Sequence, residues 1–108
     1  MAGELVAAFW IRQPGADEDQ LLKVFPADEQ TWIMGRANRC DLMLADFSVS
    51  STHARLEYSR AGWKLSDLDS SNGTAINGVS VEQRSPLVSG DIVSLGSVEL
   101  IFRSLLKR

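Results

Sequence analysis

The chain has 108 residues, of which 44% are hydrophobic, and a formal net charge of −3 at pH 7. This length fits one domain that buries about two thirds of its unfolded surface, enough for a core without metals or disulfides. The acidic balance argues against a nucleic-acid partner, which requires a basic face, and no apolar run approaches the roughly 18 to 20 residues of a membrane span.

Short apolar runs separated by turn signals follow one another along the chain. In chain order, the predicted strands are 5–11, 21–25, 31–34, 41–44, 54–58, 63–68, 74–76, 79–81, 92–95 and 98–102. Turn signals at about every ten residues, among them Pro14-Gly15, Pro26, Gly62, Ser89-Gly90 and Gly96, are typical of an all-β sandwich or barrel. We expect a single domain over residues 1–102, followed by a C-terminal tail or the start of a linker at 103–108.

Two predicted strands and one turn carry more specific signals. In 53–58, Ala54, Leu56 and Tyr58 alternate with His53, Arg55 and Glu57, so we expect this strand to be half-buried. The alternation in 63–67 directs Asp67 inward, close to the loop that follows. Asn77-Gly78 between two apolar pairs predicts a two-residue hairpin turn with positive φ at both central positions.

Three polar clusters lie between the predicted strands. They are Gly35-Arg36, Ser50-Ser51-Thr52-His53 and Ser70-Ser71-Asn72-Gly73-Thr74. Together they offer a guanidinium, several hydroxyls and a carboxamide, which are the donors that a phosphate group needs. In residues 36–60, four arginines outnumber three acidic side chains, so the charge beside these clusters is locally basic. The sequence therefore predicts an anion site, built on loops, for a phosphorylated residue.

Other kinds of site fit the sequence poorly. The Asp67, Asp69 and Ser71 spacing resembles a calcium loop, but Asn72 and Gly78 stand where such a loop needs glycine and glutamate. With one histidine, no metal-ligand spacing and no phosphate-binding G-x-x-x-x-G-K sequence, we expect neither catalysis nor a metal or cofactor. Cys40, the single cysteine, is interpreted as a bystander that cannot form an internal disulfide.

The clusters, in this order and spacing, resemble the forkhead-associated (FHA) domain. The resemblance covers about residues 31–102 and includes Gly35-Arg36, Ser50-x-x-His53, Asn72-Gly73-Thr74 and Asn77-Gly78. Asp41-Leu42-x-Leu44 before the serine motif, and Gly90-Asp91-x-Val93-x-Leu95-Gly96 before the last strand, also fit. The resemblance implies an eleven-stranded β-sandwich of two twisted sheets, whose loops at one end bind a phosphothreonine peptide.

The resemblance also implies a role for each motif residue. Arg36 would bind the phosphate, with Ser50, Ser51 and Ser71 as hydroxyl donors. Asn72 would bind the peptide backbone, and Asn77 would border the groove or fix its loop. Structural support of the site would come from Gly35, His53, Asp67, Gly73 and Thr74. Many family members have a basic or asparagine side chain where this chain has Ser51, so one phosphate contact is reduced to a hydroxyl.

The sequence thus predicts a cytoplasmic, non-catalytic module that binds a phosphothreonine-containing protein, such as a Ser/Thr kinase or its substrate. A cytoplasmic setting is also expected because residues 1–10 do not form a secretory leader. The alternative is a scaffold or self-association domain that uses the same fold without phosphate. An exposed apolar patch on a sheet face would favour that alternative.

Overall fold

The computed structural model describes residues 3–12, 15, 17–28 and 30–107, and within them the chain is all-β, as predicted. Part of the predicted Pro14-Gly15 turn and the last residue of the predicted tail lie outside the described residues. The eleven strands are β1 (Glu4–Ile11), β2 (Gln20–Pro26), β3 (Thr31–Gly35), β4 (Leu42–Met43), β5 (Ala54–Ser59), β6 (Gly62–Asp67), β7 (Thr74–Ile76), β8 (Val79–Ser80), β9 (Ser85–Leu87), β10 (Ile92–Leu95) and β11 (Val98–Lys107).

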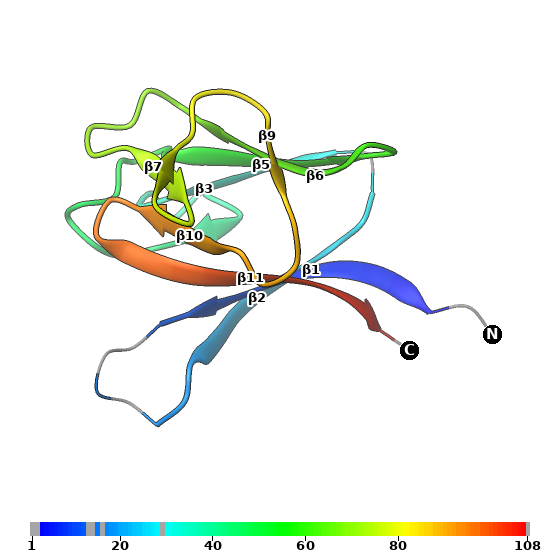
Figure 1. Ribbon diagram of the computed structural model, residues 1–108. Coiled ribbons are helices and arrows are strands. Elements are labelled where there is room, and N and C mark those ends of the chain that lie inside the picture. The colour runs from blue at the N-terminus through cyan, green and yellow to red at the C-terminus, as the bar shows by residue number, and fades with distance from the viewer. Residues whose placement is uncertain (1–2, 13–14, 16, 29, 108) are drawn as a thin grey trace.

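The strands form two sheets that lie in two layers (Figure 1). One sheet has six strands in the order β2-β1-β11-β10-β7-β8, and the other has five in the order β4-β3-β5-β6-β9. Pairing is antiparallel except between β3 and β4, which are parallel. This is the eleven-stranded sandwich that the resemblance implied.

The core lies between the two sheets and is rich in aromatic rings. Phe9 and Phe102 of one sheet have ring centroids 5.4 Å apart, and Phe102 lies 6.1 Å from Trp63 of the other. Trp63 in turn lies 5.9 Å from Trp32. Aromatic pairs at these separations stabilise a core beyond the area that they bury. The contacts therefore fix how the sheets stack, and with it the position of the loops at their ends.

Two strands differ from the sequence prediction. β9 was not predicted because Pro86 lies at its centre, and proline is confined to edge strands or bulges. β9 is indeed one of the two edge strands of its sheet and pairs only with β6. The predicted C-terminal tail is instead strand up to Lys107, because residues 103–107 continue β11 and pair with Glu4–Ala8 of β1.

The connections that carry the three polar clusters gather at one end of the sandwich, and the paired start of β1 and end of β11 lie at the other end (Figure 1). The gathered connections are 36–41 and 44–53, which flank β4, and 68–73, between β6 and β7. The β10–β11 turn also lies at this end. In the part of the chain that the structure describes, no helix is long and apolar enough to cross a membrane.

Candidate functional site

The end of β3 packs directly against the serine cluster. The backbone N–H groups of Arg36 and Ala37 donate to the carbonyl oxygens of Ser50 and Ser51, at 2.9 and 3.1 Å. A methyl group on Gly35 would overlap the Ser51 carbonyl oxygen and lie 3.0 Å from that of Ser50. Gly35 is thus required by close backbone approach rather than by a left-handed conformation.

The side chain of Arg36 is exposed at this end of the sandwich. Among the described residues, its guanidinium has no hydrogen-bond or ion-pair partner. It borders a concavity of about 220 Å³, together with Ala45, Asp46 and Phe47. A planar, permanently charged group with five donors and no protein partner is well suited to an oxyanion.

His53 is fully buried and joins two of the predicted clusters. Its Nδ1 accepts the backbone N–H of Ser50 at 3.0 Å, so the ring proton lies on Nε2 and is donated to the Gly73 carbonyl oxygen at 2.9 Å. Alternation placed His53 on the side of the strand shared by Arg55 and Glu57, which are only half-buried. The imidazole is buried because the loops cover it, which the strand pattern does not encode.

Ser50 lies between the arginine and the asparagine cluster. Its Oγ accepts the backbone N–H of Ser71 at 3.0 Å, which leaves the hydroxyl proton available to a ligand. Asn72 is exposed, and its Nδ2 donates to the Ser48 carbonyl oxygen at 2.9 Å. The structure therefore brings Arg36, Ser50, Ser71 and Asn72 together on adjoining loops. Ser51 is exposed on the same loop as Ser50, and no side-chain bond of Ser51 occurs among the described residues.

The loop after β6 is organised by Asp67. Its Oδ1 accepts the Thr74 hydroxyl at 2.6 Å and the Ser70 hydroxyl at 2.5 Å, and its Oδ2 accepts the Ser70 backbone N–H at 3.1 Å. Burial raises the pKa of this carboxyl, but the bonds from Ser70 and Thr74 outweigh burial and lower it below its ordinary value. Asp67 is thus an ionised brace for the loop.

Gly73 links this loop to two others. Its φ of +85° is the left-handed conformation that favours glycine. Its carbonyl oxygen accepts His53 Nε2–H and, at 3.1 Å, the backbone N–H of Gly96 in the β10–β11 turn. These contacts fix the Gly73–Thr74 peptide group, one residue beyond Asn72.

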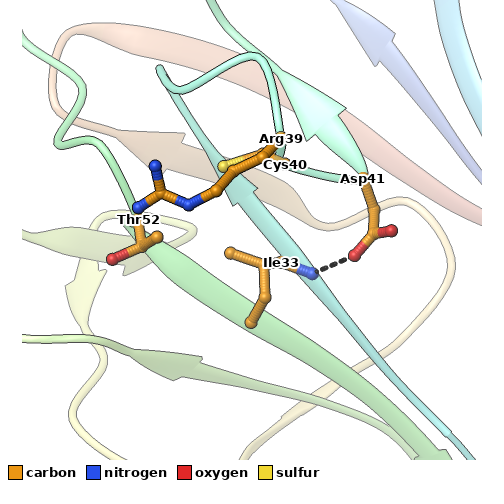
Figure 2. A pocket seen from close by; sticks show the side chains of 5 residues that line it. All are labelled: Ile33, Arg39, Cys40, Asp41 and Thr52. Carbon is orange, nitrogen blue, oxygen red and sulfur yellow. Dashed lines mark hydrogen bonds between the residues drawn. The ribbon is translucent and has the colours of Figure 1, made fainter.

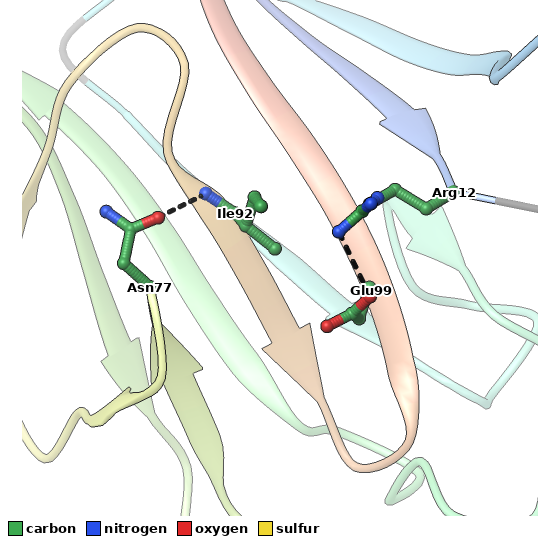
Figure 3. A network of polar contacts seen from close by, with 4 residues as sticks. All are labelled: Arg12, Asn77, Ile92 and Glu99. Carbon is green, nitrogen blue, oxygen red and sulfur yellow. Dashed lines mark hydrogen bonds and ion pairs between the residues drawn. The ribbon is translucent and has the colours of Figure 1, made fainter.

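Asn77 lies apart from the cluster, at the far end of β7. Asn77 and Gly78 have φ of +50° and +81°, which confirms the predicted hairpin turn. The Asn77 Oδ1 accepts the backbone N–H of Ile92 at 2.9 Å (Figure 3). Its Nδ2 donates to the Asp91 carboxylate, also at 2.9 Å. The same view shows the Arg12–Glu99 ion pair, 3.3 Å, between β11 and the residue after β1. Asn77 thus fixes its own turn to β10.

Sequence reasoning did not identify the polar network below Phe47. Asp46 Oδ1 accepts both the backbone N–H and the hydroxyl of Ser48, at 2.9 and 2.7 Å. Both bonds lower the pKa of Asp46 below its ordinary value, and the bond from the Ser48 hydroxyl has the larger effect. The Ser48 Oγ also accepts the backbone N–H of Ser97 at 2.9 Å. The D-x-S spacing was a local signal for such a turn, but the contact with Ser97 depends on the fold.

A second small concavity lies behind the serine loop. It has a volume of about 160 Å³ and is lined by Ile33, Arg39, Cys40, Asp41 and Thr52 (Figure 2). The Asp41 carboxylate accepts the backbone N–H of Ile33 at 2.8 Å, and the Cys40 thiol donates to the Ser51 carbonyl oxygen at 3.1 Å. Both side chains therefore bond to local backbone, and Cys40, which was interpreted as a bystander, has a structural contact. Among the described residues, no group of His, Cys, Asp or Glu is arranged to hold a metal ion.

Comparisons with known proteins agree with this geometry. The family model for the cytoplasmic domain of an inner membrane component of the T3SS matches residues 19–105. The FHA domain-containing protein FhaA of Mycobacterium tuberculosis is 32% identical over 81 residues, which are 75% of this chain and 15% of FhaA. The chain thus spans a small part of that relative.

Two solved structures share both sequence and fold with the chain. One, from a study of phosphothreonine-dependent FHA domain interactions, has a TM-score of 0.73 and 26% identity, and the match covers 93% of this chain and 95% of that one. The other is the FhaA FHA domain in complex with the intracellular domain of Rv3910, with a TM-score of 0.73, 27% identity and coverage of 90% and 99%. Motifs, fold and relatives agree, and the chain belongs to the forkhead-associated domain family.

Proposed function

We propose that this chain is a non-catalytic module that binds phosphothreonine peptides. The observation that carries this proposal is the exposed Arg36 guanidinium, which has no partner among the described residues and lies on a loop bonded to the serine cluster. A phosphate offers the charge and the paired acceptor oxygens that such a group binds in a bidentate manner. The serine and asparagine loops supply further donors around it.

Each predicted site residue takes a role in this proposal. Arg36 and the hydroxyls of Ser50, Ser51 and Ser71 bind the phosphate, and Asn72 binds the peptide backbone beside it. His53, Asp67, Gly73 and Thr74 hold the loops in place, and Gly35 allows their close approach. Asn77 acts through its turn, because both ends of its amide are already bonded, one to Ile92 of β10 and the other to Asp91 just before that strand. Loops ordered before the ligand arrives lower the ordering cost of binding.

The partner class follows from the same site. We propose a phosphothreonine-containing protein in a Ser/Thr kinase pathway, with the domain working in the cytoplasm and without a cofactor. Two relatives support this direction: one solved structure concerns phosphothreonine-dependent interactions, and the FhaA domain was solved with an intracellular partner domain. The chain matches 15% of FhaA, so the proposed partner class concerns this domain alone.

The test is titration with a degenerate phosphothreonine peptide library and its unphosphorylated counterpart. Hydrogen bonds to charged groups contribute about 1.5 to 3 kcal/mol each, so loss of a bidentate contact in Arg36→Ala is expected to weaken binding about a hundredfold or more. Arg36→Lys should restore little, because an ammonium lacks the planar fork. Affinity is measured by isothermal titration calorimetry, and folding of each variant by circular dichroism.

The matched control is Arg60→Ala, which removes an exposed arginine from the β5–β6 connection, at the other end of β5. It should bind like wild type. Equal binding of phosphorylated and unphosphorylated libraries, or no binding by folded wild-type protein, would contradict the proposal.

One observation favours the phosphate-independent alternative. The outer face of β2, β1 and β11 carries an apolar groove of about 450 Å³, lined by Val6, Ala8, Trp10, Leu21, Val24, Leu105 and Leu106. β2 is also one of the two edge strands of its sheet, so a second copy of the chain could pair there and cover the groove. A dimer by analytical ultracentrifugation, together with the absence of phosphopeptide binding, would support self-association instead.

A further inference from the structure

The most exposed large apolar side chain beside the candidate phosphate site is Phe47. It is 97% exposed, whereas Val49, two residues on, is 1% exposed and belongs to the core. A phenylalanine fully in water makes no contribution to the stability of the domain through burial. Phe47 lines the same concavity as Arg36, so a peptide bound at Arg36 passes close to the ring.

The loop holds Phe47 from both sides. Asp46 accepts two hydrogen bonds from Ser48, and the Val49 backbone N–H donates to the Asp46 carbonyl oxygen at 3.0 Å. Ser48 in turn is bonded to Ser97 and Asn72. The ring therefore projects from a fixed backbone, and binding against it costs little ordering of the loop.

Ser48 also packs tightly against the β10–β11 turn. A methyl group on Gly96, whose φ is +58°, would overlap the Ser48 carbonyl oxygen and lie 2.7 Å from its Oγ. Movement of the Phe47 segment toward this turn is therefore blocked. The concavity between Phe47 and Arg36 is a fixed feature of the end of the sandwich.

The lining of this concavity combines one cation with apolar surface. Arg36 contributes charge, Ala45 and Phe47 contribute a methyl and a ring, and Asp46 contributes a carboxylate already bonded to Ser48. A volume of about 220 Å³ exceeds that of one water several times over and accommodates part of an amino-acid side chain. Arg36 and Phe47 line the same concavity, and three extended residues span at most about 11 Å, so peptide residues close to a phosphate on Arg36 reach Phe47.

We propose that Phe47 makes this domain select phosphothreonine peptides that carry an apolar side chain, aliphatic or aromatic, within three residues of the phosphothreonine. This inference rests on the proposed function and deepens it. The phosphate bound by Arg36 supplies the requirement for phosphorylation, and the side chain packed on Phe47 supplies the choice among phosphorylated partners. Burial of apolar surface on both molecules is the driving force.

The test uses phosphothreonine peptide libraries in which one position at a time, from three before to three after the phosphothreonine, is fixed as Leu, Ala, Lys or Glu. We expect wild-type protein to bind the Leu library about tenfold more tightly than the Ala library at one position. Phe47→Ser should lose this preference and retain the requirement for phosphate. Phe47→Leu should retain most of the preference.

Val88→Ser is the matched control, because it replaces another exposed apolar residue, at 64% exposure, that does not line the concavity. It should select like wild type. Phosphate-dependent binding without a preference for Leu, or a preference that survives in Phe47→Ser, would overturn this inference and leave the proposed function standing. A preference for Lys would also overturn it, because the ring and Asp46 would then receive a cation. Absence of phosphate-dependent binding in wild type would overturn both.

Discussion

At the scale of single residues, His53 decides how the serine and asparagine clusters are spaced. The ring accepts from Ser50 through one nitrogen and donates to Gly73 through the other, so a single side chain sets both loops. Because the residue is fully buried, neither bond is exchanged readily for a bond to water. The imidazole is a spacer of fixed length in the protein interior.

Replacements of His53 should separate its two bonds. His53→Asn places an acceptor near Nδ1 and keeps the contact to Ser50, whereas His53→Gln places a donor near Nε2 and keeps the contact to Gly73. We expect His53→Ala to lower the free energy of unfolding by about 2 to 4 kcal/mol through a cavity and two unpaired groups. Phosphopeptide affinity should be closer to wild type in Asn than in Gln, because Ser50 is a phosphate donor in the proposed function.

These variants are compared by urea unfolding and by calorimetric titration at a temperature at which all of them are folded. The reverse order of affinity, Gln above Asn, would mean that Gly73 rather than Ser50 is the anchor that binding requires.

The residues also differ in how far the sequence alone could predict them. Arg36, Ser50 and Asn72 were found because their donors and their motif spacing are local properties of the chain. The contacts of Ser48 with Ser97 and Asn72 join residues 49 and 24 positions apart, and no periodicity encodes such pairs. The exposure of Phe47 could not be predicted either, because a single phenylalanine in a sequence is usually interpreted as core.

At the scale of elements, the loop between β6 and β7 depends on one carboxylate. Asp67 lies at the end of β6 and accepts bonds from Ser70 and from Thr74, the first residue of β7, so it holds both ends of the loop. Its pKa is lowered in the folded protein. The stabilisation that ionised Asp67 contributes is therefore complete when the pH is above the pKa of the unfolded state, about 3.9. It is lost as the pH falls through the lower pKa of the folded state.

Asp67→Asn should remove the pH dependence that Asp67 gives to the stability of the domain. The amide cannot accept the Ser70 backbone N–H with its nitrogen, so we expect the free energy of unfolding to fall by about 1 to 2 kcal/mol at pH 7. Below pH 4, the difference from wild type should shrink as the wild-type carboxylate becomes protonated. Asp69→Asn is the control in the same loop, since asparagine tolerates the φ of +53° at that position. Urea unfolding from pH 2 to 7 measures both, and a constant difference over that range would contradict the account.

The strands themselves show where sequence patterns succeed and fail. Alternation and turn signals predicted the long strands of both sheets because each buries one face and ends at a turn. β9 was missed, since it is three residues long and contains Pro86. The extension of β11 was missed as well: Arg103 and Ser104 break its apolar pattern, and it is pairing with β1 that keeps the segment in a strand.

At the scale of the whole molecule, that extension pairs residues 103–107 with residues 4–8 and so makes both segments part of the fold. Truncation after Phe102 would remove every pairing partner of Glu4–Ala8 on β11. It would also remove Leu105, which is 40% exposed and so partly buried in the outer groove. We expect the free energy of unfolding of the truncated chain to be about 1 to 3 kcal/mol lower than that of a chain ending at Lys107.

Chemical denaturation of the two chains measures this difference, and the phosphopeptide affinity of the folded protein should be unchanged because the polar loops lie at the other end. Equal stability of the two chains would show that residues 103–107 contribute nothing to the folded state. A loss of affinity without a loss of stability would instead indicate coupling along the length of the sandwich.

The pairing of Glu4 with Lys107 has a practical consequence for how the domain can be attached to other structures. Entry and exit of the chain side by side mean that the domain can be inserted into a surface loop of a host protein, or immobilised through either terminus. In each geometry the loops that carry the three polar clusters project away from the point of attachment (Figure 1). A fluorescent reporter or a sensor surface joined at either terminus should therefore leave the approach of a phosphorylated partner unobstructed.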